Sequence, residues 1–409
     1  MDTGEKMDKN DHRILGKELD LFTFSDLVGP GLPMWTPKGT VIREELDKFV
    51  QQLRGKYGYN RVTIPHITKR ELYEISGHWN KFSDELFKIT SREGKEYALK
   101  PMSCPHHTQI FDRKPHSYKE MPQRYAETTM VYRDEQSGEL GGLTRVLSIT
   151  QDDAHVFCRH LQVKEEFLKI WDIVDNFYKA FGFVLRTRLS FREPENQEKY
   201  LGTKEIWDKA EDILRKIAEE RGANYFEGPG EAALYGPKLD FMAKNSAGRE
   251  WQVATIQLDM NIPERFDLTC VNEKGEKERI VMIHAAITGA LERCIAILIE
   301  HFAGAFPLWL SPVQIMVIPV RTNHNEYAKQ IFDTLQENNI RAELNDADEN
   351  LGSKVRDVKE NKIPYWIVIG DKEIESNKVT LESRDGRQLG QITKEELLQK
   401  LLKEIRDKK

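Results

Sequence analysis

The chain has 409 residues, of which 39% are hydrophobic and 31% are charged, and its formal net charge at pH 7 is −6. This length allows about two or three domains with sizeable cores, and the charged content together with the lack of any apolar run of about 18 residues argues for a soluble protein. Four cysteines are too few for a disulfide framework, and the opening MDTGEKMDKNDHR is too polar for a secretory signal, so a cytoplasmic protein is expected.

Residues 1–10 are predicted to form a disordered leader. A stretch rich in proline and glycine begins near Gly29 and precedes a predicted helix, whose apolar residues repeat at helical spacing: Ile42, Leu46, Phe49, Val50 and Leu53. The sequence RVTIPHI, residues 61–67, is then predicted to be a strand that contains Pro65. Because proline lacks a backbone donor, this strand is expected at the edge of a sheet.

Two long amphipathic helices are predicted next. The first ends at Gly182 and has an apolar stripe formed by Val163, Phe167, Ile170, Val174, Phe177 and Phe181. The second covers residues 204–221, with Thr203 as its N-cap and Gly222 as its end. Strand-like patterns follow at residues 233–243, 249–260 and 279–287.

The pattern changes near Pro307 and Pro312. Beyond these prolines, strand-like and helix-like segments alternate. Strands are expected at residues 313–320, 340–346, 364–370 and 378–383, and helices at residues 327–338, 353–360 and 393–406. Such alternation is typical of a small α/β domain with a partly parallel sheet.

The densest cluster of charged residues lies between residues 131 and 158. Arg133 and Glu135 are two positions apart, so on an extended strand they share a face, where a guanidinium can bind phosphate and a carboxylate can accept from an amino group. The turn-rich SGELGG then predicts a hairpin-like return. Even spacing on the return strand places further polar residues on one face, namely Arg145, Gln151, Asp153 and His155. The alternative is a solvated charged hairpin.

This segment resembles motif 2 of the class II aminoacyl-tRNA synthetases, and of the threonyl enzymes in particular. The resemblance extends over nearly all of residues 10–409, from DHRILGKELDLF through KPMSCPHH and LYGPKLDF to IHAAITGALER. It implies an α+β fold, with a class II catalytic domain of antiparallel sheet and helices at residues 11–308 and a small α/β anticodon-binding domain at residues 309–409. The long helix and the strand with Pro65 resemble motif 1, which implies a homodimer.

The resemblance also implies how ATP is bound, with Mg²⁺ as its companion ion. Arg133 would hold the α-phosphate, Glu135 the adenine amino group and Arg145 the γ-phosphate. Gly289 and Arg293 resemble motif 3, in which the arginine lies under the adenine. The remaining ATP-binding positions are Gln252 and Thr255.

One zinc ion per chain is implied as well, with Cys104, His155 and His284 as its ligands. Three such ligands leave the fourth position of a tetrahedral ion open, and in the family threonine fills it with its amino group and hydroxyl. Without the resemblance, His284 between apolar neighbours is more typical of a core histidine, and Cys104 of a small buried residue. His106 and His107 are rival ligands because they lie close to Cys104 in the sequence.

Further positions match family residues that line the threonine side of the adenylate pocket: Met102, Gln151, Asp153, Tyr235 and Gln257. Of these, Asp153 would orient the threonine hydroxyl, whereas Tyr235 could equally be a structural tyrosine. The residues expected to take part in catalysis are Arg133, Arg293, Lys238 and His78. His78 matches a family histidine near the terminal ribose of tRNA, and an exposed loop histidine is the alternative.

In residues 309–409 the resemblance implies contacts with the anticodon of tRNA from Asp348, Arg356 and Glu373. Asp348 and Glu382 stand where well-known bacterial members have asparagine and arginine. Other departures lie nearer the chemistry, where Leu147 and Ser148 replace an Arg-Gly pair and Ala285 replaces an arginine after the zinc histidine.

The sequence therefore predicts ATP-dependent activation of L-threonine to threonyl-adenylate and its transfer to the 3′ end of threonine tRNA. No editing domain is expected, because the segment DHRILGKELDLF already begins at Asp11. One alternative is another class IIa synthetase, such as the prolyl or seryl enzyme, which the three zinc ligands disfavour. The other is a non-catalytic synthetase-like regulator that binds RNA, which Arg133 and Arg293 disfavour because a regulator needs no phosphate clamps.

Overall fold

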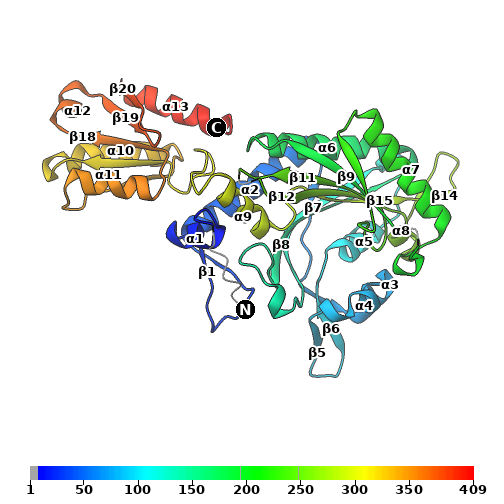
Figure 1. Cartoon of the computed structure of the whole chain (residues 1–409). Coiled ribbons are helices and arrows are strands. Elements are labelled where there is room, and N and C mark those ends of the chain that lie inside the picture. Colours follow the sequence, from blue (N-terminus) through cyan, green and yellow to red (C-terminus); the bar gives the residue numbers. More distant parts are fainter. Residues whose placement is uncertain (1–7, 194, 247) are drawn as a thin grey trace. The chain divides into compact units, whose positions relative to one another are not determined.

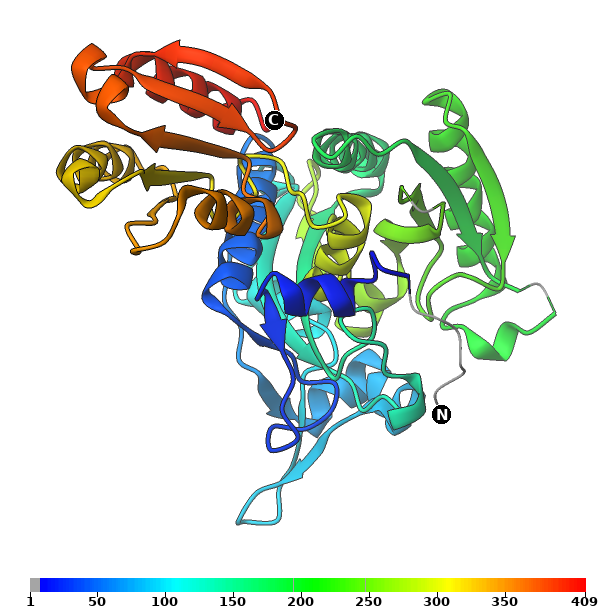
Figure 2. The same cartoon turned by 60° about the vertical axis from the view of Figure 1, so that its left-hand side comes forward.

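The computed structural model describes residues 8–193, 195–246 and 248–409. Most of the leader predicted at residues 1–10 lies outside the described residues. The chain divides into two compact units (Figure 1 and Figure 2): a small unit of residues 8–23, 34–46 and 297–409, and a large unit of residues 24–33 and 47–296. The domain boundary predicted between residues 308 and 309 stays a prediction.

An eight-stranded sheet forms the centre of the large unit, in the order β10-β9-β11-β12-β15-β8-β7-β3. Its neighbouring strands are antiparallel, except for the parallel outer pairs β10–β9 and β7–β3. The strands are β3 (Asn60–Arg61), β7 (Gln123–Tyr132), β8 (Ser148–Cys158), β9 (Leu185–Phe191), β10 (Tyr225–Pro229), β11 (Lys238–Lys244), β12 (Glu250–Asp259) and β15 (Val281–Ala286). This sheet confirms the expected α+β class.

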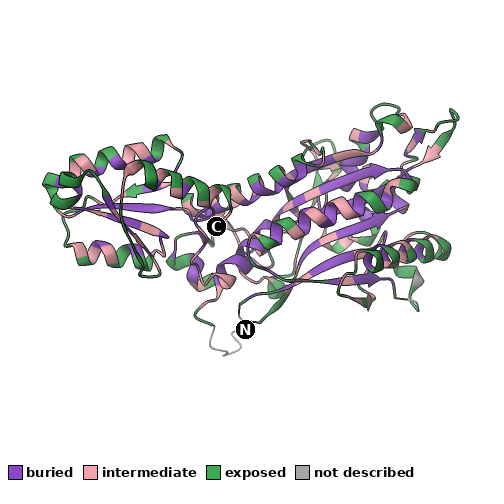
Figure 3. Cartoon of the chain, turned by 90° about the horizontal axis from the view of Figure 1, so that it is seen from above, coloured by how far each residue is buried: buried purple, intermediate pink, exposed green. Residues whose placement is uncertain are grey.

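Helices cover one face of this sheet (Figure 3). All six residues of β15, VMIHAA, are buried, whereas β8, β11 and β12 keep partly exposed residues. Phe49 of α2 (Pro37–Gly55) stacks on Phe177 of α6 (Val163–Lys179) at 5.3 Å between ring centroids. Trp171 of α6 packs edge-on against Phe241 of β11 at 5.1 Å.

Both amphipathic helices predicted for this unit are present. The predicted apolar stripe of α6 is buried, and Gly182 follows the helix in the left-handed conformation, with φ of 76°. In α7 (Lys204–Glu220) the Thr203 side chain accepts a hydrogen bond from the backbone of Ile206, as expected of an N-cap. The other helical segments are α3 (Arg70–Ser76), α4 (His78–Lys81), α5 (Cys104–Asp112), α8 (Asn261–Arg265), α9 (Leu291–His301), η1 (Ser83–Glu85), η2 (Tyr118–Glu120), η3 (Ser137–Glu139), η4 (His160–Gln162) and η5 (Gln197–Lys199).

The predicted strand at residues 61–67 is wrong. The chain leaves β3 after Arg61, and pairing resumes only in β4 (Ile67–Lys69), which belongs to a three-stranded sheet with β5 (Lys88–Thr90) and β6 (Glu96–Leu99). Pro65 lies in the irregular segment between the two sheets. A residue without a backbone donor fits such a crossing as well as it fits an edge strand.

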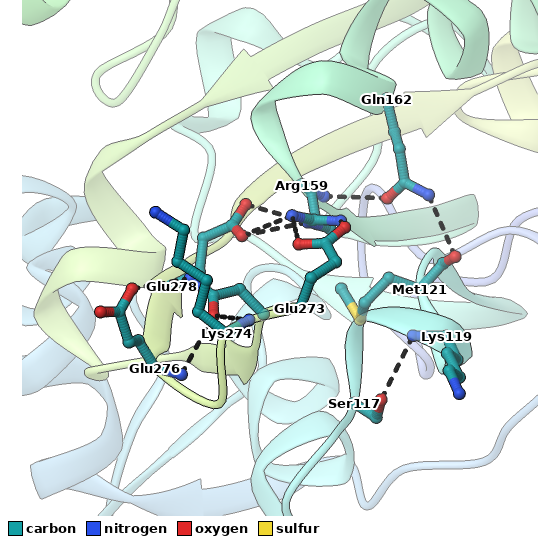
Figure 4. Close-up of polar contacts among 10 residues, drawn as sticks. Ser117, Lys119, Met121, Arg159, Gln162, Glu273, Lys274, Glu276 and Glu278 are labelled. Carbon is teal, nitrogen blue, oxygen red and sulfur yellow. Dashed lines mark hydrogen bonds and ion pairs between the residues drawn. The ribbon is translucent and has the colours of Figure 1, made fainter.

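A small hairpin, β13 (Thr269–Val271) and β14 (Lys277–Arg279), is tied to the end of β8 by Arg159. The Arg159 guanidinium bonds the carboxylates of Glu273 and Glu278 at 2.7–3.1 Å (Figure 4). The Arg159 side chain is 10% exposed, whereas that of Glu273 is 54% exposed, so the hairpin is held by charge-assisted bonds at the protein surface.

The small unit is built on a five-stranded sheet in the order β17-β16-β18-β19-β20. Strands β17, β16 and β18 are parallel and the others antiparallel, which confirms the predicted partly parallel α/β sheet. The elements are α1 (His12–Glu18), β1 (Phe22–Thr23), β2 (Met34–Trp35), β16 (Ile315–Pro319), η6 (Thr322–His324), α10 (Asn325–Glu337), β17 (Ala342–Leu344), α11 (Leu351–Glu360), β18 (Tyr365–Ile369), α12 (Asp371–Ser376), β19 (Val379–Ser383), β20 (Gln388–Ile392) and α13 (Lys394–Arg406).

Six of these elements were not predicted: α1, β1, β2, η6, α12 and β20. The hairpin β19–β20 turns at Asp385 and Gly386, and Gly386 has φ of 81°. Asp-Gly is a strong hairpin signal, so the sequence contained the information. Across the described part of the chain, no helix has both the length and the apolar character needed to cross a membrane.

Candidate active site

A cleft of about 350 Å³ opens over one face of the eight-stranded sheet. Many of the predicted site residues line it: Met102, Cys104, Arg133, Gln151, Asp153, His155, Tyr235, Lys238, Gln252, Thr255, Gln257 and His284. Its other lining residues had no predicted place in the site: Phe82, Pro101, Val131, Ala233, Ala285 and Ala286. The sheet therefore gathers residues from most of the large unit around one space.

Side chains of the strands form the floor of the cleft, because alternate residues of a strand point to the same face. Gln151, Asp153 and His155 are successive odd positions of β8 and face the cleft together, as their even spacing predicted. On β12 the spacing is irregular, because Gln252 and Thr255 are three residues apart. A shift in the register between β11 and β12 falls at this point and keeps both side chains on the cleft face.

Cys104, His155 and His284 form a compact, buried cluster at one end of the cleft. One ligand atom from each lies within 4.8 Å of the others. His155 and His284 are directly opposite each other on β8 and β15, with His155 Nε2 and His284 Nδ1 3.1 Å apart. Cys104 is the first residue of α5. The strand register, and not the sequence spacing, brings these residues together.

The donor set of this cluster fits a zinc ion. One thiol and two imidazoles are typical zinc ligands, and the 3.1 Å between the nitrogens is close to the roughly 3.3 Å between two corners of a zinc tetrahedron. Each imidazole also uses its other nitrogen in a supporting contact, His155 Nδ1 with His107 Nδ1 at 2.7 Å and His284 Nε2 with Asp259 Oδ2 at 2.9 Å. Such supporting contacts fix ring orientation at metal sites.

Of the rival ligands, His106 lies away from the cluster and contacts Thr68 Oγ1 at 3.1 Å, whereas His107 supports His155. Burial raises the pKa of the Cys104 thiol well above its usual value and lowers the pKa of His155 well below its own. The low pKa keeps His155 neutral, which is the form that binds a metal.

Asp240 organises the other end of the floor. Its carboxylate is fully buried, and it accepts hydrogen bonds from Gln252 Nε2 at 2.9 Å and from Thr255 Oγ1 at 2.8 Å. Lys238 Nζ lies 3.2 Å from the same carboxylate. Sequence analysis missed both Asp240 and Asp259, although each lies two positions after a predicted site residue and so on the same face of its strand.

Arg133 reaches the cleft, but not from a strand as predicted. Strand β7 ends at Tyr132, and the Glu135 amide donates to the Arg133 carbonyl at 3.0 Å, so the chain turns there. Arg133 Nε is buried and has no hydrogen-bond partner within the described part of the chain. A buried guanidinium donor left open in a cleft is suited to an anionic ligand.

Glu135 and Arg145 do not line the cleft. Arg145 precedes β8, which starts at Ser148, so its predicted place on the return strand is wrong. It pairs with Glu135 at 2.7 Å and with Glu139 at 3.3 Å, and its side chain is 49% exposed. The hairpin itself is confirmed, because β7 and β8 pair antiparallel on either side of this loop.

Arg293 is on the first turn of α9 and is partly buried. Burial lowers the pKa of Arg293, and the positive charge of Arg133 adds to this effect. Gly289, before the helix, has φ of 62°, a conformation that glycine adopts without strain. The effect of the Arg133 charge on Arg293 indicates a positive field that an anion can relieve.

His78 is fully buried at the start of α4, which excludes the exposed loop histidine considered above. Its Nδ1 contacts Ser76 Oγ at 2.8 Å and its Nε2 lies 2.9 Å from Met102 Sδ. Since Met102 lines the cleft, His78 lies directly behind the cleft wall.

The predicted anticodon residues lie in the small unit. Asp348 and Arg356 are exposed. Glu373 is buried, and its two carboxylate oxygens accept from the Gly370 amide at 3.1 Å and from Thr380 Oγ1 at 2.8 Å. Glu373 thus stabilises the start of α12, whatever else it contacts.

Acid is expected to destabilise the large unit, because buried histidines stay neutral in it, among them His78 and His106, which are not proposed as metal ligands. Burial lowers the pKa of His78 to about 3 and that of His106 to about 4. Both would titrate near about 6.5 in the unfolded chain, which therefore binds more protons below that pH. Their contribution to stability is complete above about pH 6.5 and is lost as the pH falls toward 4 and 3, by up to about 1.4 kcal/mol per pH unit for each histidine.

Denaturant unfolding at about pH 7, 6 and 5 measures this slope. A variant with His78→Asn and His106→Asn should show a shallower slope than the unaltered chain. Equal slopes would show that other groups cause the acid sensitivity.

Comparison with known proteins gives a consistent result. Residues 87–302 match the family described as tRNA synthetase class II core domain (G, H, P, S and T), and residues 314–404 match an anticodon binding domain. Curated relatives include the threonine–tRNA ligases of Cytophaga hutchinsonii, 48% identical, and Phocaeicola vulgatus, 47% identical, each over 98% of this chain. The chain spans 63% and 62% of the length of these two relatives.

Among solved structures, the chain is similar to a structure described as the RNA binding domain of threonyl-tRNA synthetase from Cryptosporidium parvum. The TM-score is 0.92 at 35% identity, and the match covers 96% of this chain and 98% of that one.

Proposed function

The chain belongs to the threonyl-tRNA synthetases of class II, and on that premise we propose that it activates L-threonine with ATP and transfers the product to threonine tRNA. One observation carries this proposal: a single cleft joins a buried Cys-His-His cluster to the open guanidinium of Arg133. A zinc ion held by the cluster would be suited to an amino group with a neighbouring hydroxyl, and the guanidinium of Arg133 is suited to a phosphate. The two substrates of an amino-acid activation reaction need both.

Cys104, His155 and His284 would hold the zinc ion. When bound, zinc supplies an open coordination position for the amino group and hydroxyl of threonine. Asp153 lies in the cleft beside this cluster, with Oδ1 3.6 Å from His155 Nε2, and can accept a hydrogen bond from the hydroxyl of threonine. Valine lacks that hydroxyl and would leave Asp153 without a partner, so a site of this kind rejects it strongly.

In the activation step, the threonine carboxylate attacks the α-phosphorus of ATP and pyrophosphate leaves. No protein base is needed, because the carboxylate is already the nucleophile. Arg133 and Lys238 face the cleft and would stabilise the negative charge that moves through the phosphates, and Arg293 would extend this field. Mg²⁺ would accompany ATP. Gln252 and Thr255, fixed by Asp240, would hold the nucleotide.

Four further residues complete the proposed threonine pocket: Met102, Gln151, Tyr235 and Gln257. Gln257 Nε2 has no hydrogen-bond partner within the described residues, so it can donate to a substrate. His78 is proposed to act through Met102, whose sulfur it contacts. Glu135 and Arg145 would reach ATP only after their mutual ion pair opens.

The small unit is proposed to bind the anticodon of threonine tRNA, with Asp348, Arg356 and Glu373 as the contacting residues. The match of residues 314–404 to an anticodon binding domain supports this assignment. A homodimer is proposed through α2 and β3, and the position of β3 at the edge of its sheet supports it, since an edge strand offers open backbone groups to a partner.

Amino-acid-dependent exchange between ATP and pyrophosphate tests the proposed function. We expect strong exchange with threonine and weak exchange with serine, which keeps the amino group and hydroxyl but lacks one methyl group, a difference of about 10- to 200-fold. Valine should give almost none. Robust exchange with proline, or no exchange with any of the standard amino acids, would overturn the proposal.

A further inference from the structure

Arg54 on α2 is a buried cation that the proposed chemistry does not use. Its side chain is 1% exposed, and its guanidinium lies beneath the sheet. Nη1 forms an ion pair with Asp152 Oδ1, and Nη2 donates to the carbonyl of Ala285 at 3.4 Å. Arg54 therefore contacts both β8 and β15, the two strands that carry the histidines of the metal cluster.

Asp152 connects this pair to the turn that follows β15. Its Oδ2 accepts hydrogen bonds from the Ile287 amide at 2.8 Å and from the Thr288 amide at 3.0 Å. Its own amide donates to the Gly289 carbonyl at 3.1 Å. The Asp152 carboxylate, whose charge Arg54 balances, thus binds two amides of the turn at residues 287–289, and the Tyr178 hydroxyl donates to the Ile287 carbonyl of the same turn at 2.8 Å.

The residues on either side of Asp152 face the cleft. Gln151 and Asp153 line it, whereas Asp152 points to the opposite side of the sheet, as alternation requires. Glu292, one residue before Arg293, accepts from the Thr150 amide at 2.8 Å and from its hydroxyl at 2.7 Å. Residues 150–152 of β8 therefore hold both the turn and the start of α9.

Charge makes this arrangement sensitive to either partner. Arg54 and Asp152 are both almost fully buried, so removing one of them leaves the other as an uncompensated charge inside the protein. A displaced Asp152 would release the amides of Ile287 and Thr288, and with them the path of the chain toward Arg293. A displacement of about 1 Å among positioning groups is enough to lower a rate about 100-fold.

We propose that Arg54 is a positioning residue for the ATP and threonine site, acting through Asp152 on the turn at residues 287–289. This inference rests on the proposed function. The ion pair between Arg54 and Asp152 fixes the position of β8 relative to the chain that leads from β15 into α9. Gln151 and Asp153 on β8 therefore keep their positions relative to Arg293 on α9. Arg54 itself touches no substrate.

The test compares Arg54→Met and Arg54→Lys with Arg159→Met. Arg159 is a matched control, because it also lies in the large unit, pairs with carboxylates and is largely buried, but its partners hold the β13–β14 hairpin away from the cleft. Two quantities are measured in each variant: the kcat and KM of threonine-dependent exchange, and the hydrogen-exchange rates of the Ile287 and Thr288 amides.

Arg54→Met is expected to lower kcat/KM by about 10- to 100-fold, mainly through kcat, and to speed exchange of the two amides. Arg54→Lys, which keeps the charge, should restore much of both. Arg159→Met should lower the melting temperature but leave kcat, KM and the two amides unchanged. If Arg54→Met fails to fold, the pair Arg54→Met with Asp152→Leu removes both charges and the oxygen that accepts from the two amides, so the protein should fold with these amides still unprotected.

The inference is overturned if Arg54→Met affects kcat/KM no more than Arg159→Met does, or if the amides of Ile287 and Thr288 keep their protection. The amide measurement needs no substrate. A lack of threonine-dependent exchange in the unaltered chain would therefore contradict the proposed function, while the amides alone would still decide whether Arg54 positions the turn.

Discussion

Replacement of Cys104 by serine is expected to remove the bound zinc and to lower threonine-dependent exchange by more than about 100-fold. The thiolate of Cys104 is the only charged ligand among the three, and a serine hydroxyl is a much weaker donor for zinc. The side chain is buried at 1% exposure, so no solvent-exposed group can take its place. Metal analysis of the purified protein and the exchange assay measure the two effects.

Cys158→Ser is the matched control for this experiment. Cys158 is also a buried, free cysteine, and it lies three residues after His155 on β8, outside the metal cluster. Its replacement buries the same hydroxyl and should affect stability alone. A Cys104→Ser protein that is free of metal and still active would refute the zinc site.

Replacement of Arg133 by alanine is expected to lower kcat for exchange by about 100- to 1000-fold, the usual cost of removing one donor that stabilises charge in the transition state. Arg133 faces the cleft and keeps an open, buried Nε. Arg145→Ala should cost clearly less, because Arg145 is half exposed and already paired with Glu135 and Glu139. Steady-state kinetics with ATP as the varied substrate separate kcat from KM.

The ranking of the two arginines is what the structure adds to the resemblance, which treats both as phosphate ligands. If Arg145→Ala lowers kcat more than Arg133→Ala, the pairing of Arg145 with Glu135 does not persist when ATP is bound. The exposed Arg249, which stacks on Trp251 outside the cleft, offers a control for the loss of one positive charge.

Part of the site could be predicted from the sequence, because side chains of a strand point to the same face at every second residue. Gln151, Asp153 and His155 share a face because strands alternate, and this could be seen without any partner strand. The cluster of Cys104, His155 and His284 could not, because their separations of 51 and 129 residues (155 − 104 and 284 − 155) carry no local signal. Only the pairing of β8 with β15 sets the two histidines opposite each other, and the resemblance to the family supplied that information.

Residues that support the site were missed for a different reason. Asp240 and Asp259 have the right spacing, but a carboxylate that only orients its neighbours looks like any other buried polar residue in the sequence. Arg54 carried a clearer signal, because it follows Val50 by four positions and so lies on the apolar stripe of its helix. A charged residue on a buried stripe needs a partner, and Asp152 is that partner.

The errors in the predicted elements arose where chain direction changes. The segment with Pro65 has the composition of a strand, yet it crosses between two sheets, and composition does not report which sheet a residue joins. Arg133 lies just after β7 and Arg145 lies just before β8. The alternating pattern of polar residues in the sequence includes both arginines, although neither belongs to a strand. The Arg54 guanidinium donates to the backbone carbonyl of Ala285, a bond that does not depend on the side chain at position 285, so the departure from the family pattern at Ala285 has no structural explanation.

The floor and the rim of the cleft differ in how easily they can move. Floor residues belong to adjacent strands, and shifting one of them would break ladder hydrogen bonds on both sides. The rim consists of Phe82, Pro101, Met102, Ala233 and Tyr235, which lie outside the strands of the large sheet. The floor therefore resists movement more than the rim does. Gln151 and Gln257 of the proposed threonine pocket belong to the floor, whereas Met102 and Tyr235 belong to the rim. Side chains presented by a rigid floor lose little conformational entropy when a ligand binds.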